Sequence, residues 1–298
     1  MYSAAEIVTV AGESGLTYAQ NKNRGGRSSA KGRDFEIVYG AYRVALAAAE
    51  AFRTGGLGAG ISFHDQVQCF VDDFIASGPD GRTLSQLKSG AAHWNGGDHP
   101  LVDDFELQAK LDAVCGVVAA YELVVGDDGQ RDTLIASRPA GLGSVSVVSF
   151  PGGLSDLELI DRLGDLADAL TELSPRPPER IVREQVWRML LGTWQGSRGD
   201  QSLATLVNNA GHGPGAIVAP LLPPYVLSDA AIKALDNVAG LRFYIRKNFF
   251  VFEALRGMQQ GVADYHCHTP EFEGFVTNLL IAKPTDFFGF WDVLKAHV

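Results

Sequence analysis

The sequence predicts an α/β fold with a mostly helical region in the C-terminal half of the chain. Two observations lead to this prediction. Over residues 34–150, segments with the apolar period of a helix are followed by short runs typical of strands. Over residues 151–298, leucines recur at helical spacing between prolines. Helices that alternate with strands favour a layered α/β domain, which we place at residues 34–150.

The composition is that of a globular protein, and the length suggests about two domains. The chain has 298 residues, of which 46% are hydrophobic and 20% charged. A net charge of -10 disfavours a protein that coats nucleic acid non-specifically, although a local basic strip still allows an enzyme to bind DNA. We find no signal peptide, no apolar run of about 20 residues, and only three scattered cysteines. We therefore expect a soluble, cytoplasmic protein that does not enter a membrane.

Residues 1–33 are predicted to form a flexible basic arm. The segment Gln20–Arg33 has no apolar side chain larger than alanine and carries five positive charges. Such a segment buries too little apolar surface to order itself. The alternative is an arm that becomes ordered on nucleic acid or on a protein partner.

Residues 34–88 predict a helix followed by a β-hairpin. Asp34 can cap a helix that runs to Phe52, because apolar side chains recur along it at three- and four-residue steps. The strand-like runs that follow are Gly60–His64, Val67–Ala76 and Arg82–Lys88. The turn Gly78-Pro79-Asp80-Gly81 joins the last two runs as a hairpin.

The rest of the α/β block is predicted to add one helix and two strands. After a polar loop over residues 89–100, apolar residues at helical spacing predict a long helix over 102–124. Thr133–Ala136 and Val145–Phe150 are the two predicted strands.

Residues 151–298 are predicted to serve assembly or contact with a partner. Ser155 can cap a leucine-rich helix, and Pro178 suits the first position of a second helix. A third helix is expected at about Ala230–Ala239.

Polar residues converge on the predicted hairpin. Asp72 and Asp73 lie on its first strand, and Gln86 and Lys88 lie on its second. Residues two apart on a strand share a face, so Gln86 and Lys88 point the same way, and the hairpin folds Asp73 back beside Gln86. A carboxylate, an amide oxygen and an ammonium would then meet at one end of the sheet. The plainer alternative is a pair of solvated aspartates and a surface lysine on an edge strand.

Hydrolysis of a phosphodiester uses this combination of groups. Oxygen ligands hold Mg²⁺, and the metal polarises the phosphate and lowers the pKa of a bound water. A lysine steadies the attacking hydroxide or the charge that builds on phosphorus.

The order of these residues resembles the PD-(D/E)xK nuclease superfamily, in which an acid on a helix precedes an Asp at one strand and an (Asp/Glu/Gln)-x-Lys sequence on the next. Over about residues 33–150 the chain looks like the double-stranded DNA endonuclease domain of bacterial anti-phage effectors, which occurs in CBASS effectors with a SAVED sensor and in Lamassu-type systems. The motifs are Gly32-Arg33-Asp34-Phe35-Glu36, Asp72-Asp73-Phe74-Ile75 and Gln86-Leu87-Lys88-Ser89. This resemblance implies a restriction-endonuclease-like core of helix, mixed sheet and helix.

The resemblance also implies a role for each residue. Asp73 is the expected metal ligand, because the aliphatic run begins directly after it, and Asp72 ranks second unless a bulge reverses the order. Gln86 would offer its carbonyl oxygen to the metal, Lys88 would act on the nucleophile, and Glu36 would complete the site from the helix. The alternative for Glu36 is a surface acid favoured by the helix dipole. Because glutamine is a neutral and weaker ligand, a slow or inactive site also fits the pattern.

The function implied is a Mg²⁺- or Mn²⁺-dependent DNA endonuclease that acts as an effector subunit in bacterial anti-phage defence. Because the chain is acidic and no sensor domain is recognised in it, we expect assembly into an oligomer or a protein partner to gate the activity. The alternative is a catalytically inactive, nuclease-like subunit that serves as an interaction protein in such a complex.

Three other segments are weaker candidates. His266-Cys267-His268 could suggest zinc, but no CxxC or distant His/Cys pair completes four ligands. Arg242–Phe250 mixes cations with aromatic residues and is predicted as a partly buried helix with solvated cations, the alternative being a DNA-facing strip. The loop residues His93, Trp94, Asn95 and His99 could contact DNA, although a simple polar loop is the more ordinary interpretation.

Overall fold

The computed structural model describes residues 2–25, 30–96, 99–197, 201–212, 215 and 217–296. The chain divides into two compact units. Unit 1 comprises Met1–Val44, Ala59–Arg162 and Trp194–Leu203, and unit 2 comprises Ala45–Gly58, Leu163–Thr193 and Ala204–Val298. Unit 1 holds most of the predicted α/β domain, but Ala45–Gly58 of that domain belongs to unit 2.

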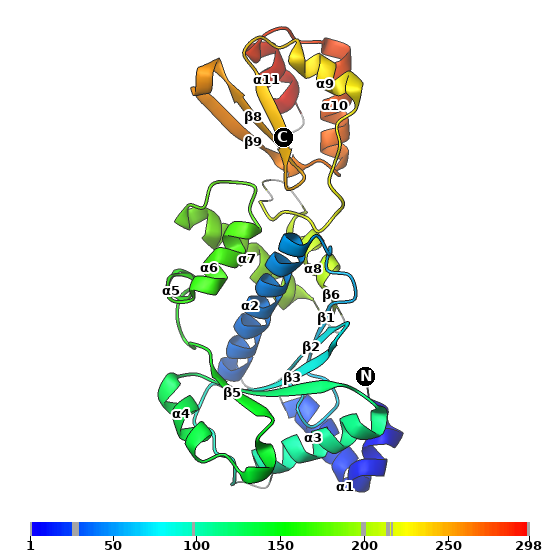
Figure 1. Ribbon diagram of the computed structural model, residues 1–298, viewed down its shortest axis with the longest axis vertical. Coiled ribbons are helices and arrows are strands. Elements are labelled where there is room, and N and C mark those ends of the chain that lie inside the picture. The colour runs from blue at the N-terminus through cyan, green and yellow to red at the C-terminus, as the bar shows by residue number, and fades with distance from the viewer. Residues whose placement is uncertain are drawn as a thin grey trace. The chain divides into compact units, whose positions relative to one another are not determined.

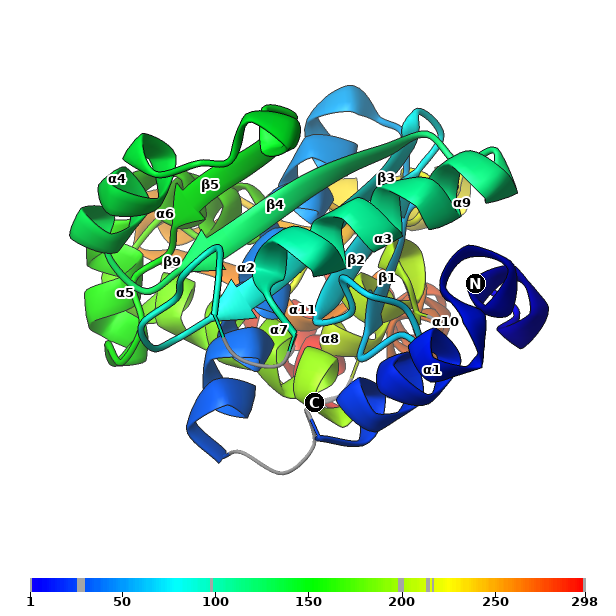
Figure 2. The same ribbon diagram turned by 90° about the horizontal axis from the view of Figure 1, so that it is seen from below.

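A six-stranded mixed sheet forms the centre of unit 1 (Figures 1 and 2). Its strands are β1 (Ser62–Asp65), β2 (Phe74–Gly78), β3 (Gly81–Lys88), β4 (Ala119–Val125), β5 (Val145–Ser149) and β6 (Gln201–Ser202), in the sheet order β5-β4-β3-β2-β1-β6. β1, β2 and β3 are antiparallel neighbours, whereas β3, β4 and β5 run parallel. The predicted α/β class is confirmed.

Helices cover both faces of this sheet (Figure 2). α1 (Ala4–Gly25) and α3 (Leu101–Cys115) pack together on one face, where Ile75 of β2 joins their apolar core. α2 (Ala30–Thr54) covers the other face, where the ring of Tyr39 meets Phe74 edge-on at 5.6 Å between centroids. Phe74 and Ile75 pack on opposite faces of the sheet because adjacent residues of a strand point to opposite sides. The helices α4 (Asp128–Ala136) and α5 (Asp156–Arg162) follow β4 and β5.

The contact between α2 and the ring of Trp194 allows no side chain at Gly40. A Cβ at this glycine would lie 2.4 Å from Trp194 Nε1, and Trp194 is buried. We expect Gly40→Ala to destabilise the protein by about 1–3 kcal/mol, because overpacking outweighs the helix propensity gained. Gly192→Ala is the matched control, since Gly192 lies inside the helix Arg180–Gly196 with open space around it and should gain up to about 1 kcal/mol. Urea unfolding measures both variants, and equal shifts would contradict the packing argument.

The predicted flexible arm is wrong for residues 4–25, which form α1. Ile7 and Ala19 of α1 are fully buried in the core of unit 1, and the side chain of Lys22 is only 15% exposed. The basic composition of Gln20–Arg33 could not show this, because the helix is held by contacts with distant parts of the chain. Residues 26–29 of the predicted arm lie outside the described residues.

Two further predictions in unit 1 need correction. The predicted helix over 102–124 ends at Cys115, where Gly116 adopts the left-handed conformation that commonly closes helices, and residues 119–125 form β4 instead. Thr133–Ala136, a predicted strand, belongs to α4, which begins where the side chain of Asp127 accepts the main-chain N–H of Gln130 at 2.9 Å.

Unit 2 is not only helical. It contains α6 (Gly164–Glu172), most of α7 (Arg180–Gly196), nearly all of α8 (Leu203–Ala210), α9 (Asp229–Asp236), α10 (Pro270–Ala282) and α11 (Phe287–Lys295). It also contains an antiparallel sheet of β7 (Arg242–Arg246), β8 (Phe249–Ala254) and β9 (Gln259–His266). Phenylalanines of β8, α10 and α11 form the core beneath this sheet. No described helix of either unit is long and apolar enough to cross a bilayer.

Candidate functional site

The β2–β3 hairpin brings Asp73 and Gln86 into direct contact. Phe74 pairs with Ser85 in the sheet, so Asp73, which directly precedes β2, lies beside Gln86. Gln86 Nε2 donates a hydrogen bond to Asp73 Oδ2, and the main-chain N–H of Leu87 donates to the same oxygen at 2.7 Å. Both side chains are buried. The predicted juxtaposition is present because the tight turn between Gly78 and Gly81 sets the register of the hairpin.

Asp72 and Asp73 precede β2 rather than lying within it. The segment 67–73, predicted as strand, has irregular backbone that is fastened to α3. Gln108 of α3 accepts the main-chain N–H groups of Phe70 at 3.0 Å and Val71 at 3.3 Å. Strand alternation therefore does not separate the two aspartates, and Asp72 also turns toward the site, where it meets a lysine.

That lysine is Lys22 of α1, which the sequence assigned to the flexible arm. Its ammonium donates to Gln86 Oε1 at 2.8 Å and to Asp104 Oδ2 at 2.9 Å, and it also donates to the carbonyl oxygen of Phe70. Asp72 Oδ1 lies 3.3 Å from the same nitrogen. A buried cation thus stands among oxygens from three separate parts of unit 1.

Asp104 is the acid of this cluster that sequence reasoning missed. It lies in the first turn of α3, where an acidic residue is commonly explained by the helix dipole alone. In the structure it is buried, and Tyr18 of α1 donates its hydroxyl to the second carboxylate oxygen at 2.8 Å. The ring of His99 stacks on Tyr18 at 3.6 Å between centroids, which places one of the predicted loop residues beside the cluster.

The cluster carries more carboxylates than cations. Burial alone lowers the pKa of Lys22, but the carboxylates of Asp72, Asp104 and Asp73 together outweigh burial, so the pKa is raised and the ammonium keeps its proton. Burial raises the pKa of Asp72 to about 7, and the charge of Asp73 adds to this rise, although the ammonium of Lys22 opposes it. The site would therefore accept additional positive charge.

Glu36 and Lys88 lie next to this cluster. Gln66 Nε2 donates to Glu36 Oε2 at 2.9 Å from the irregular segment after β1. Burial, with the charge of Asp73 as the next cause, raises the pKa of Glu36 to about 8, while the charge of Lys88 opposes the shift. Lys88 is half-buried at the end of β3, and its ammonium makes no hydrogen bond or ion pair with the described residues. It is the cation of the site that is available to a ligand.

The raised pKa of Glu36 predicts a dependence of stability on pH. The folded protein holds this proton up to about pH 8, whereas an unfolded chain releases it near 4.5, so stability falls as the pH rises between these values. We expect Glu36→Gln to flatten this part of the curve and to be more stable than wild type at neutral pH. Urea unfolding across the pH range measures this, with Glu106→Gln on the exposed side of α3 as the control for net charge. An unchanged slope in Glu36→Gln would contradict the assignment.

The oxygens of the site are of the kind that binds a divalent metal, but they are not arranged around one common point. Asp72, Asp73, Gln86 and Glu36 offer the hard oxygen ligands that Mg²⁺ prefers. Asp72 Oδ1 is buried and accepts no hydrogen bond from the described residues. However, no three acidic, histidine or cysteine side chains in the described part of the chain are placed to hold a metal together. The cation among these oxygens is the ammonium of Lys22.

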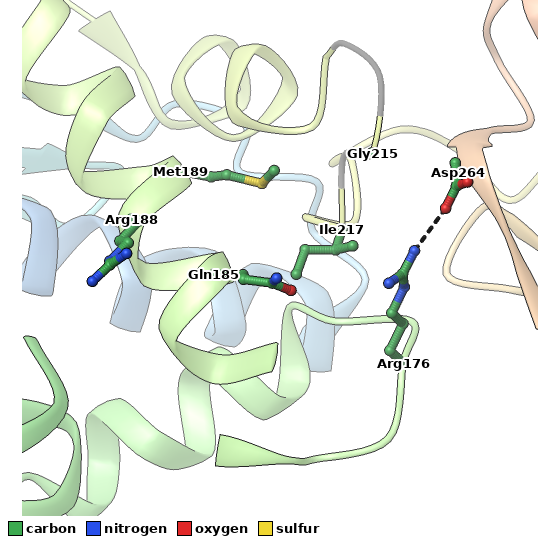
Figure 3. A pocket seen from close by; sticks show the side chains of 7 residues that line it. All are labelled: Arg176, Gln185, Arg188, Met189, Gly215, Ile217 and Asp264. Carbon is green, nitrogen blue, oxygen red and sulfur yellow. Dashed lines mark hydrogen bonds and ion pairs between the residues drawn. The ribbon is translucent and has the colours of Figure 1, made fainter. Parts of the chain in front are cut away.

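Unit 2 has a pocket of about 400 Å³ with two arginines in its lining (Figure 3). Arg176 pairs with Asp264 at 2.8 Å, and Arg188 pairs with Glu184 at 2.6 Å. The charges of these cations are already neutralised, so the pocket does not offer a strongly positive site for an anion.

The histidines proposed as zinc candidates serve structural roles. Burial lowers the pKa of His266 to about 4, and its Nδ1 accepts the main-chain N–H of His268 at 3.2 Å. Cys267 lies between them in the apolar core of unit 2. Trp94 of the polar loop is likewise structural, since it is buried and donates to the carbonyl oxygen of Leu134 at 2.8 Å.

The basic and aromatic segment Arg242–Phe250, predicted as a helix, forms the hairpin of β7 and β8. Along β7 the side chains alternate, with Phe243 and Ile245 packed on the core of unit 2 and Arg242, Tyr244 and Arg246 exposed. Neither exposed arginine forms a hydrogen bond or an ion pair with the described residues. The predicted helix is therefore wrong, and the DNA-facing strip stays a prediction.

Comparison of the chain with protein-family models, with curated proteins and with solved structures finds no match to any of them.

Proposed function

We propose that the chain is a metal-dependent DNA endonuclease of PD-(D/E)xK type, acting as the effector subunit of a bacterial anti-phage system. The observation that carries this proposal is the contact of Asp73 with Gln86 on the β2–β3 hairpin, with Lys88 on the same face of β3 and Glu36 beside them. A carboxylate and a side-chain amide are in contact there, and an ammonium lies on the same face of the strand, in the order expected for this superfamily.

The topology of unit 1 supports the same proposal. The elements α2, β1, β2, β3, α3 and β4 follow one another as a helix, three antiparallel strands, a helix and a strand parallel to its neighbour. The resemblance implies a leading helix with an acid, two strands with the motif residues, and then a helix and another strand. That last strand was expected at Thr133–Ala136, and β4 takes its place.

Each side chain has a role in this reaction. Asp73 would hold the metal, and Asp72, Glu36 and Gln86 Oε1, the oxygen that now accepts from Lys22, would complete the ligands. When bound, the divalent ion would polarise the phosphate and acidify a water molecule. Lys88, which has no internal partner among the described residues, would orient the attacking water and offset charge on the phosphate. The water would lose a proton to solvent as its oxygen bonds to phosphorus, and the leaving sugar oxygen would take up a proton from solvent as its bond to phosphorus breaks.

The ammonium of Lys22 is bound by internal oxygens, so contacts with DNA must come from another region. The candidate is the β7 strip, the exposed side chains of Arg242, Tyr244 and Arg246. Arg242 and Arg246 are separated by about 13 Å along the strand, with an exposed tyrosine between them on which a base can stack. We expect Arg242→Glu with Arg246→Glu to weaken DNA binding and to reduce its dependence on salt. Fluorescence anisotropy with labelled DNA at several salt concentrations measures this. Lys110→Glu, a charge change on the exposed side of α3, is the control, and equal losses in both variants would argue against a localised strip.

The second candidate function is a nuclease-like subunit without catalytic activity. The observation that favours it is the ammonium of Lys22 standing among the oxygens that would otherwise hold metal.

A plasmid-cleavage assay separates the two candidates. The chain is tested in Mg²⁺ and in Mn²⁺, alone and together with any protein that co-purifies, since we expect assembly to raise the activity. Metal-dependent cleavage that is lost in Lys88→Met supports the endonuclease. Absence of cleavage under all of these conditions would support the second candidate, a nuclease-like subunit without catalytic activity.

A further inference from the structure

We propose that Lys22 is the resident cation of a metal-binding position, and that a divalent ion binds there once this ammonium leaves it. The proposal deepens the proposed function, on which it rests for the use of the metal in DNA cleavage. Its physical basis, a cation position formed by Asp72, Asp104, Gln86 and Phe70, is independent of that use.

The ligand atoms around the Lys22 ammonium are those of a metal site. They are two carboxylate oxygens, from Asp72 and Asp104, the side-chain oxygen of Gln86 and the main-chain oxygen of Phe70. Calcium and magnesium sites are built from carboxylate, amide and main-chain carbonyl oxygens. Four such oxygens face one nitrogen, and three of their distances are 2.8, 2.9 and 3.3 Å.

An ammonium satisfies this position only in part. Asp72 Oδ1, in a side chain that is 1% exposed, receives no hydrogen bond from the described residues even though the ammonium is 3.3 Å away. One positive charge also faces Asp72 and Asp104, with Asp73 nearby. A divalent ion would balance this charge better, and it would draw the oxygens inward, because oxygen–metal distances of about 2.0–2.6 Å are shorter than those to an ammonium.

Removing the lysine should therefore convert the position into a metal site. Lys22→Met keeps much of the aliphatic stem but leaves two buried carboxylates without their cation, which destabilises the protein when no metal is present. Mg²⁺ or the larger Ca²⁺ should then restore the loss. We expect the melting temperature of Lys22→Met to rise by several degrees with either ion, whereas wild type changes little.

Two further variants serve as controls. Lys22→Met with Asp104→Asn removes one ligand and one excess negative charge together, so it should fold without metal and show no response to it. Lys110→Met removes a lysine from the exposed side of α3 and should behave as wild type. If Lys22→Met does not fold in chelator, refolding in Mg²⁺ but not in chelator supports the proposal, and failure in both overturns it.

Thermal unfolding and calorimetric titration with each ion provide the readouts. One ion bound by Lys22→Met, and none by the double variant, is the expected result. Equal binding by wild type and Lys22→Met would overturn the proposal, as would equal responses of Lys22→Met and the double variant. Plasmid cleavage measured in parallel separates the two ideas. If Lys22→Met gains metal binding but no cleavage is seen, the endonuclease proposal fails and the cation position stands. If wild type cleaves DNA but Lys22→Met gains no metal binding, the cation position fails and the endonuclease proposal stands.

Discussion

Lys88→Met should reduce metal-dependent DNA cleavage by about 10²–10³-fold, which is the loss expected when one charged stabiliser of a transition state is removed. Gln86 and Lys88 share a face of β3, and the positive charge of Lys88 opposes the rise in the pKa of Glu36. The ammonium makes no hydrogen bond or ion pair with the residues that the structure describes, so it is free to act on a phosphate or on an attacking water.

The same absence of internal partners separates catalysis from stability. Methionine keeps the aliphatic stem of Lys88, so the unfolding midpoint in urea should change little while cleavage falls. Lys110→Met is the control for the loss of one positive charge. Equal turnover by Lys88→Met and wild type would remove Lys88 from the reaction, and a large loss of stability would show that its role is structural.

The parts of the site that could be predicted are those fixed by short-range structure. The Gly78–Gly81 turn and the two strands beside it determine that Asp73 meets Gln86, and turn chemistry of this kind is readable from a few residues. The position of Glu36 on the leading helix followed from the motif order, but its raised pKa depends on burial, which sequence does not show.

Lys22 and Asp104 could not be predicted because their meeting is a long-range event. They are 82 positions apart, and each belongs to a segment whose local pattern has a simpler explanation. Lys22 stands in a basic, polar run, and Asp104 stands in the first turn of a helix. Only the packing of α1 against α3 shows that both side chains point inward.

Two of the errors in secondary structure, those at residues 119–125 and 242–250, share one physical cause. Residues 119–125 and 242–250 are rich in β-branched, aromatic and long aliphatic side chains, which suit a buried strand as well as one face of a helix. The left-handed backbone of Gly116 ends α3 before residues 119–125. The turn at Lys247-Asn248, where both residues have positive φ, reverses the chain within residues 242–250 and so prevents a continuous helix. Tertiary pairing with β3 and β8 then fixes the strands.

Asp73→Asn is expected to lose cleavage more completely than Asp72→Asn. Asp73 Oδ2 accepts from both Gln86 Nε2 and the main-chain N–H of Leu87, so this carboxylate aims the second predicted ligand as well as being one itself. An asparagine offers one acceptor oxygen, and its amide nitrogen would oppose any donor that it faces. A loss of about 10²–10³-fold in cleavage should accompany a loss of about 1.5–3 kcal/mol in stability, the contribution of hydrogen bonds to a buried charge.

Asp72→Asn should act differently because Asp72 contacts Lys22 and not Gln86. This substitution removes one of the carboxylates that face a single ammonium, so the remaining acids repel one another less, and its cost in stability should be the smaller of the two. Cleavage rates at saturating Mg²⁺ and urea unfolding of both variants measure the difference. If Asp72→Asn were the more damaging for cleavage, Asp72 would be the stronger ligand of the metal and Asp73 would act only by orienting Gln86.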